Sequence, residues 1–297
     1  MKEFLSLSRN QIVRKWSLLL TLSLIWGGSY ILIKKSLIVF SPVQVACLRL
    51  GISCIVFSPV FFYLLPSIDW SKLKYLIVVG LTGTGFPAFL FPIAQTEISS
   101  SLAGVLSSLS PLFTLVLGVL FFGMAVQRSK IIGVILGLMG AVLLIGFGAI
   151  AGIKGNLWYG VFIIIGCFSY ATSTNMVKAK LQEVSSFIIS AIAFFITGIP
   201  CIFYLFSTDI LNVIQVHEYG WKSLGAVALL SLAGTVLATI LFFKLVQVSN
   251  PVFASLVSYL IPLVAVLFGL LDGEAITILH FLGMFLILSG VYWSRGK

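Results

Sequence analysis

Residues 224–243 read LGAVALLSLAGTVLATILFF, twenty consecutive positions without a charged side chain. A helix of this length, rising 1.5 Å per residue, covers the roughly 30 Å of hydrocarbon in a bilayer. Similar uncharged runs recur along the chain, separated by short segments that hold charges, Pro and Gly. Each run indicates a membrane-spanning helix, because a helix at the surface of a soluble domain keeps a polar face.

The composition of the whole chain agrees with these runs. Of its 297 residues 60% are apolar and 9% are charged, against roughly 45–50% and about 25% in soluble domains. Dividing the chain at its charged segments predicts ten spans, at residues 16–33, 43–65, 73–93, 101–122, 131–150, 157–177, 187–206, 224–243, 252–271 and 276–293. The least distinct divisions are the short turns at 96–100 and 272–275. We therefore predict an all-α polytopic membrane protein of about ten transmembrane helices.

The distribution of basic residues predicts the orientation, because Lys and Arg gather in cytoplasmic loops. With the N-terminus inside, thirteen lie on the cytoplasmic side: Lys2, Arg9, Arg14, Lys15, Lys72, Lys74, Arg128, Lys130, Lys178, Lys180, Lys244, Arg295 and Lys297. Only Lys34, Lys35, Lys154 and Lys222 lie on the other side, and Arg49 falls within a span. An even number of spans then places both the N- and the C-terminus in the cytoplasm.

The chain also repeats itself. The matched positions are Trp26, Gly27 and Lys34 with Tyr170, Ala171 and Lys178 at an offset of 144, Gly83 and Thr84 with Gly234 and Thr235 at 151, Ala103, Pro111 and Gly118 with Ala254, Pro262 and Gly269 at 151, and Gly133 and Gly140 with Gly283 and Gly290 at 150. Offsets that drift so little indicate one duplication, with halves at 1–152 and 153–297. Since each half holds five spans, an odd number, the second half enters the membrane from the opposite side. Transporters are often built from such inverted repeats.

Several short segments, in order along both halves, carry a family resemblance. They are LIWGGSY at 24–30, Pro42 with Arg49, SSLSPL at 107–112, SYLIPL at 258–263, Gly273-Glu274, and the spacing of Gly283 and Gly290. Together they resemble the EamA family of the drug/metabolite transporter superfamily, over essentially the whole chain. The resemblance implies a central cavity lined mainly by the first, third and fourth helices of each half, and small metabolites, often exported amino acids, as substrates. The chain departs from the pattern at Gly123-Met124, where the family often has an acidic residue matching Glu274.

Polar and aromatic residues within the spans are the candidates for that cavity. Arg49 lies seven residues past Pro42, about 10 Å into its span, where a charge usually faces a cavity or a partner; the alternatives are snorkelling to the interface or a structural pairing. Hydroxyl groups precede a Pro in the fourth span of each half, and Pro frees a backbone carbonyl that a hydroxyl or a ligand can use. The predicted substrate-cavity residues are Trp26, Ser29, Tyr30, Arg49, Thr84, Ser107, Ser108, Pro111, Tyr170, Thr174, Thr235, Ser258, Tyr259 and Pro262.

Other functions fit the sequence less well. The spans contain almost no His, Asp or Glu, and a serine without a His partner is a poor nucleophile, so we predict that the protein is not an enzyme. His217 and His280 have no second ligand at metal-binding spacing, so neither a metal nor another cofactor is expected. The net charge is +10, and the Lys and Arg residues behind it are distributed as expected for the loops of a membrane protein. They form no basic stripe with interleaved aromatic residues, which argues against nucleic acid as a partner.

We therefore predict a secondary transporter that moves small organic metabolites, with amino acids or related compounds as the first expectation, often by export. Alternating access would occur at a central cavity between the repeats. The partners are a small-molecule substrate and the lipid bilayer, the protein is a monomer or a homodimer, and its location is a bacterial cytoplasmic (inner) membrane. Transport of phosphorylated or nucleotide-linked metabolites, and a channel, remain the alternatives.

Overall fold

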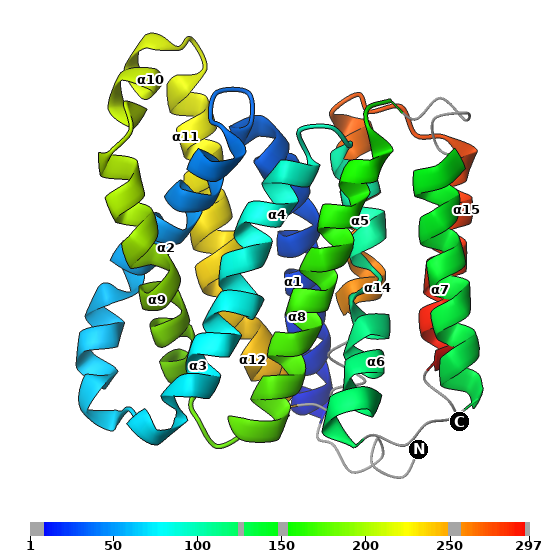
Figure 1. Ribbon diagram of the computed structural model, residues 1–297, viewed down its shortest axis with the longest axis horizontal. Helices are drawn as coiled ribbons and strands as arrows, with labels where there is room; N and C mark the ends of the chain where they lie inside the picture. The colour runs from blue at the N-terminus through cyan, green and yellow to red at the C-terminus, as the bar shows by residue number, and fades with distance from the viewer. Residues whose placement is uncertain (1–8, 124–127, 148–153, 249–256, 295–297) are drawn as a thin grey trace.

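A computed structural model describes residues 9–123, 128–147, 154–248 and 257–294. Within these ranges the chain is helical and contains no β-strand (Figure 1). The α-helices are α1 (Arg9–Ser36), α2 (Pro42–Leu64), α3 (Leu73–Gly80), α4 (Phe86–Ala94), α5 (Ser100–Ser107), α6 (Ser110–Phe122), α7 (Arg128–Phe147), α8 (Gly160–Lys180), α9 (Ser186–Phe206), α10 (Ile210–Val216), α11 (Gly220–Leu229), α12 (Ala238–Val248), α14 (Val257–Leu271) and α15 (Ile278–Ser294). Short 3₁₀ or π segments join them at η1 (Leu65–Ser67), η2 (Trp70–Lys72), η3 (Leu81–Gly85), η4 (Leu157–Tyr159) and η5 (Leu230–Leu237).

Seven helical stretches of the described residues are long and apolar enough to cross a membrane. They are Lys15–Ser36, Pro42–Ser67, Trp70–Ala94, Ser100–Phe122, Leu157–Lys180, Ser186–Phe206 and Gly220–Phe242. The remaining three predicted spans correspond to shorter apolar helices, Ile131–Ile145, Leu260–Leu271 and Ile278–Gly290; the parts predicted at 148–150 and 252–256 lie outside the described residues. The all-helical membrane fold is thus confirmed, while the count of ten spans and the orientation stay predictions.

The short turns predicted at 96–100 and 272–275, where the division into spans was least distinct, both separate two helices. The turn after α4 leads to Ser99, whose side chain accepts a hydrogen bond from the Leu102 amide and so caps α5. The turn after α14 contains Gly273, whose positive φ of 78° is a conformation that side chains with a Cβ rarely adopt. Neither pair of neighbouring helices is one continuous helix.

The main helix contacts join the first half of the chain to the second. Helix α2 packs most extensively against α9, and α7 against α15. Helix α1 packs against α14, and α8 packs against α4 and α6 in the corresponding way. The predicted halves, 1–152 and 153–297, are therefore interleaved, and Figure 1 shows α1 and α8 near the middle with the α7–α15 pair at one edge.

Glycines allow α7 and α15 to approach closely. A Cβ on Gly290 would lie 2.5 Å from the carbonyl oxygen of Gly133 and 2.6 Å from the amide nitrogen of Gly137. This is the close packing that the spacing of Gly133 and Gly137 favours in an apolar helix.

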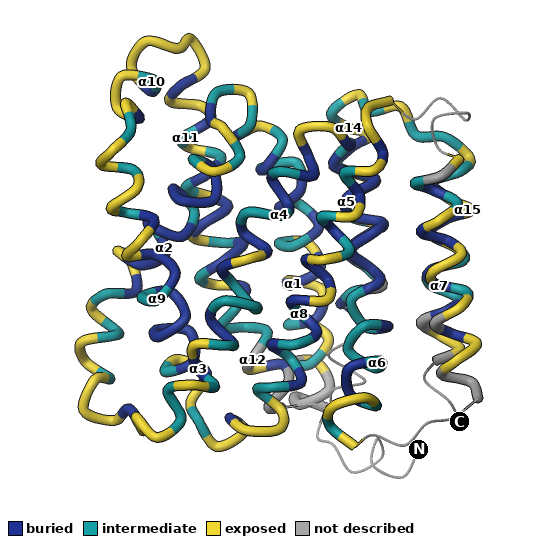
Figure 2. Tube along the Cα trace, viewed as in Figure 1, coloured by how far each residue is buried: buried dark blue, intermediate teal, exposed yellow. Residues whose placement is uncertain are grey.

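Burial follows the membrane pattern rather than that of a soluble protein. Large apolar side chains such as Phe121 and Phe206 are exposed on the outer faces, where Figure 2 shows much of the exposed surface along the peripheral helices. Inside, hydroxyl groups such as Ser23 Oγ and Ser53 Oγ donate to the carbonyl four residues earlier, each at 2.8 Å. Polar groups in hydrocarbon need such internal partners.

Candidate functional site

Arg49 connects the two halves of the chain through hydroxyl groups. It lies on α2, and its Nε donates a hydrogen bond of 2.6 Å to Thr235 Oγ1 in η5. The Tyr170 hydroxyl of α8 lies beside the same guanidinium. Arg49 itself is half-buried. Both neighbours come from the second half of the sequence, so this charge sits at the junction of the halves.

Tyr30 of α1 and Ser107 of α5 complete this group of side chains. The Tyr30 hydroxyl lies beside Ser107 and faces Arg49 and Tyr170. The Phe91 ring packs between the two tyrosines, with its centroid 5.9 Å from each. Five predicted residues, Arg49, Tyr30, Tyr170, Ser107 and Thr235, are thus brought together from five elements, and we refer to them as the Arg49 cluster.

The repeated Gly-Thr pairs both lie in π-helical turns. Gly83 and Thr84 are in η3, and Gly234 and Thr235 are in η5. A π turn shifts the backbone hydrogen-bond register and is frequent at functional sites. In η5 the Thr235 hydroxyl donates to the carbonyl of Leu230, five residues earlier, at 3.3 Å, while it accepts from Arg49.

Each π turn packs against the first helix of the opposite half. A Cβ on Gly234 would lie 2.7 Å from Ser29 Oγ, and one on Gly83 would lie 2.3 Å from Ser173 Oγ. These two serines are 144 residues apart, the offset at which Trp26 matches Tyr170. The Trp26 indole adds a hydrogen bond of 3.1 Å from Nε1 to the Gly234 carbonyl.

Three other predicted hydroxyl groups donate to backbone carbonyls three or four residues earlier in the chain. Ser29 Oγ donates to Ile25 O at 2.8 Å, Ser108 Oγ to Val105 O at 2.5 Å, and Thr174 Oγ1 to Tyr170 O at 2.9 Å. Such bonds occupy the donor and leave the oxygen free to accept.

The prolines of the two halves are not equivalent. The sequence places both in the middle of a span, but helix α5 ends at Ser107 and Pro111 stands in the first turn of α6, where its missing amide needs no partner. Pro262 is inside α14. Thr84 and Ser258 are half-buried on their helices without a described contact to Arg49, and the side chain of Tyr259 lies outside the described residues.

A second polar group lies at the far end of α1, and it contains none of the predicted cavity residues. The Glu274 carboxylate accepts from the amides and hydroxyls of Ser100 and Ser101, at 2.6–3.1 Å, and from Lys34 Nζ at 2.9 Å. Asp272 pairs with Lys34 at 2.6 Å and with Lys35. We call these six residues the Glu274 clamp. It joins α1 and the start of α5 to the turn between α14 and α15.

The electrostatics of the clamp favour ionised carboxylates. Burial alone would raise the pKa of Glu274, but the hydrogen bonds from Ser101, Lys34 and Ser100 outweigh it and lower the pKa to about 2. The pKa of Asp272 is also lowered, since Lys34 and Lys35 outweigh its desolvation. The only sequence signal for this clamp was the Gly273-Glu274 motif, which does not name a partner about 240 residues earlier.

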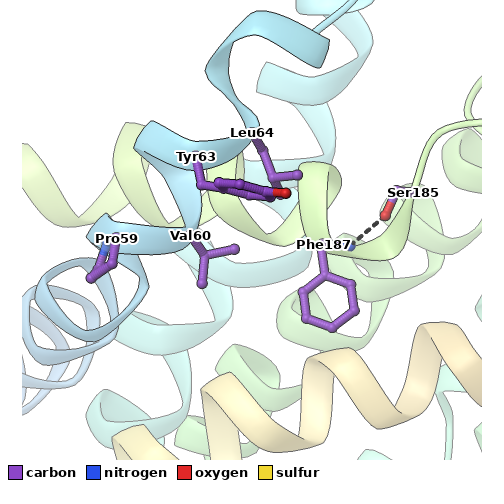
Figure 3. A pocket seen from close by; sticks show the side chains of 6 residues that line it. All are labelled: Pro59, Val60, Tyr63, Leu64, Ser185 and Phe187. Carbon is purple, nitrogen blue, oxygen red and sulfur yellow. Dashed lines mark hydrogen bonds between the residues drawn. The ribbon is translucent and has the colours of Figure 1, made fainter.

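One hollow lies away from both groups. It has a volume of about 470 Å³ and is formed by Pro59, Val60, Tyr63 and Leu64 of α2 with Ser185 and Phe187 at the start of α9 (Figure 3). Its lining is almost entirely apolar, and it includes no predicted cavity residue. Among the residues that the structure describes, the Arg49 cluster combines a cation, phenols and hydroxyls at the junction of the halves, an arrangement that can hold a small polar molecule by directed hydrogen bonds.

Comparison with known proteins gives consistent matches over nearly the full length. The sequence profile of the "EamA-like transporter family" matches residues 15–146 and 157–295. An uncharacterized transporter of Archaeoglobus fulgidus is 26% identical over 94% of this chain and 98% of its own length. The uncharacterized inner membrane transporter YedA of Escherichia coli K12 is 25% identical over 95% and 90%. A probable amino-acid metabolite efflux pump of Salmonella typhimurium is 24% identical over 93% and 92%.

The fold also matches that of a solved protein. A crystal structure superimposes with a TM-score of 0.62 over 93% of this chain and 94% of the other, at 17% sequence identity. At that identity the match concerns the fold alone.

Proposed function

Because the chain belongs to the EamA-like transporter family, we propose that this membrane transporter moves small organic metabolites by alternating access at the Arg49 cluster. The observation that supports this proposal is the hydrogen bond from Arg49 to Thr235, 186 residues away on the opposite half. A group held by both halves is reorganised when the halves rock against each other, as inverted-repeat transporters require. The predicted halves at 1–152 and 153–297 are part of this proposal.

Amino acids or related compounds are the proposed substrates, often in the direction of export. The relative from Salmonella typhimurium carries the name of an amino-acid metabolite efflux pump. Phosphorylated or nucleotide-linked metabolites are less compatible, because such groups are usually held by several Arg or Lys side chains, and Arg49 is the only basic residue in the interior of a predicted span. We place the protein in a bacterial cytoplasmic membrane, with both termini inside, as a monomer or a homodimer.

Counterflow in proteoliposomes tests the proposal. A labelled amino acid should enter faster when the vesicles are preloaded with the same compound, because a carrier returns faster with substrate bound. Ohmic currents without such acceleration would identify a channel and refute the carrier.

A matched pair of variants locates the path. Gly234→Ala places a methyl group 2.7 Å from Ser29 Oγ, whereas Gly225→Ala, on the preceding helix, has no atom within 4 Å of the new methyl. Overpacking costs on the order of 1–3 kcal/mol, and at this contact it should hinder the movement of η5 past α1. A barrier higher by ~1.4 kcal/mol would slow counterflow about tenfold. Equal rates for Gly225→Ala and Gly234→Ala would place the path elsewhere.

A further inference from the structure

The charge on Arg49 has no counter-charge in the part of the chain that the structure describes. Its hydrogen-bonding neighbours, Thr235 and Tyr170, are neutral. The described ion pairs join only Lys34 and Lys35 to Asp272 and Glu274. The sequence places none of its eight acidic residues within a predicted span. A guanidinium thus stands about 10 Å from the start of α2, and the partners described for it are the hydroxyls of Thr235 and Tyr170.

An unpaired cation at this depth is costly, and such residues usually mark the path of a substrate. Interactions with an anion would offset that cost, since hydrogen bonds between ionised partners are roughly twice as strong as neutral ones. The guanidinium presents five N–H donors in a planar fork; Nε donates to Thr235, and Tyr170 is its second hydrogen-bonding partner, so part of the fork is left. The remaining donors suit a planar anion with two oxygens.

We propose that Arg49 is a carboxylate-binding subsite, and that the transported molecule carries one carboxylate. This inference rests on the proposed function, and it names the chemical class of the substrate at that site. The Tyr170 and Thr235 hydroxyls hold the guanidinium in place and share its charge until the substrate arrives. Tyr30 and Trp26 provide aromatic surface for the rest of a small molecule.

The charge balance favours one carboxylate over a phosphate. One carboxylate group matches the single charge of the Arg49 guanidinium, whereas a phosphate dianion carries one negative charge more than the guanidinium can pair. The nearest basic residues on α1, Lys34 and Lys35, are engaged by Asp272 and Glu274. Within the described ranges, neither of these two lysines is thus left to serve a dianion as a second cation at the cluster.

Paired acids and amides provide the test. Thermal unfolding of the purified protein in detergent is followed with each of the neutral and aromatic amino acids, lactate and pyruvate, and with the primary amide of each. At least one acid should stabilise the wild type with an affinity about tenfold above that of its amide, and Arg49→Gln should abolish that preference. Lys222→Gln, which removes an exposed cation beside Tyr219, is the control and should retain it.

The wild-type comparison decides the matter even where Arg49→Gln does not fold. The subsite is overturned if no acid in the panel binds more tightly than its amide, or if folded Arg49→Gln keeps the preference. Counterflow of an amide at the rate of its acid would retain the carrier and remove the carboxylate subsite. Ohmic currents without counterflow of any compound would refute the proposed function, and the inference with it.

Discussion

Removing the charge of Glu274 should destabilise the protein by an amount that depends on pH. Glu274→Gln keeps the size of the side chain but replaces the carboxylate that accepts from Ser100, Ser101 and Lys34. The side chain is only 5% exposed, so solvent screens it little. Lowering its pKa from 4.5 to about 2 corresponds to ~3 kcal/mol of stability at neutral pH.

The sign follows from the direction of that pKa change. A carboxyl group whose folded-state pKa is depressed contributes its full stabilisation above the unfolded-state pKa, near 4.5, and loses it as the pH falls toward 2. The difference between wild type and Glu274→Gln should therefore be ~3 kcal/mol at pH 7 and fall to ~1 kcal/mol at pH 3.

Equilibrium unfolding in mixed micelles with increasing dodecyl sulfate, followed by tryptophan fluorescence at both pH values, measures this difference. Glu218→Gln, in an exposed position of the segment after α10, is the matched control and should change the free energy of unfolding by less than about 0.5 kcal/mol. A Glu274→Gln effect that is the same at pH 7 and pH 3, or equal to that of Glu218→Gln, would refute the ionised clamp.

Three further predictions concern packing and the Arg49 cluster. Gly290→Leu should destabilise the protein by about 1–3 kcal/mol in the same unfolding assay, because its Cβ would meet the backbone of α7, while Gly225→Ala should be neutral or slightly stabilising. Thr235→Val should reduce counterflow about tenfold by removing the acceptor of Arg49 Nε, and Thr235→Ser should retain transport; equal loss in both would show that shape rather than the hydroxyl matters. Trp26→Phe removes the bond to the η5 backbone and should lower stability by about 1 kcal/mol, with no change at all contradicting the bond.

The spans could be predicted closely where an uncharged run ends at a capping residue or a charge. Predicted spans at 101–122 and 187–206 compare with observed stretches Ser100–Phe122 and Ser186–Phe206. The internal irregularities could not be predicted. The break between α5 and α6 and the π turns η3 and η5 depend on backbone hydrogen-bond register, to which the hydrophobic pattern of a span is insensitive.

The members of the Arg49 cluster were predictable as single residues, because ionisable and hydroxyl groups are conspicuous in apolar spans. Their pairing was not. Which hydroxyl meets Arg49 depends on the depth and rotation of α2 against η5, and these are set by packing between helices far apart in the sequence. The same holds for the Glu274 clamp, in which Lys34 meets a partner 240 residues away. Its charges lie at span ends, where Lys usually serves as an interfacial anchor.

Under the predicted duplication, the second half has no arginine at the position that corresponds to Arg49. At the offset of 144 that relates Trp26 to Tyr170, Ala193 of α9 stands where α2 has Arg49. A Cβ on Gly80, next to η3, would lie 3.0 Å from the Cα of Ala193. Close packing between the backbones of α3 and α9 therefore occupies the place that corresponds to the contact of Arg49 with η5. Two arginines related by the repeat would bring two unpaired charges into the membrane and call for a dianion. With the single Arg49, the one carboxylate of a bound substrate pairs with the guanidinium, and this pairing fixes one end of an asymmetric molecule.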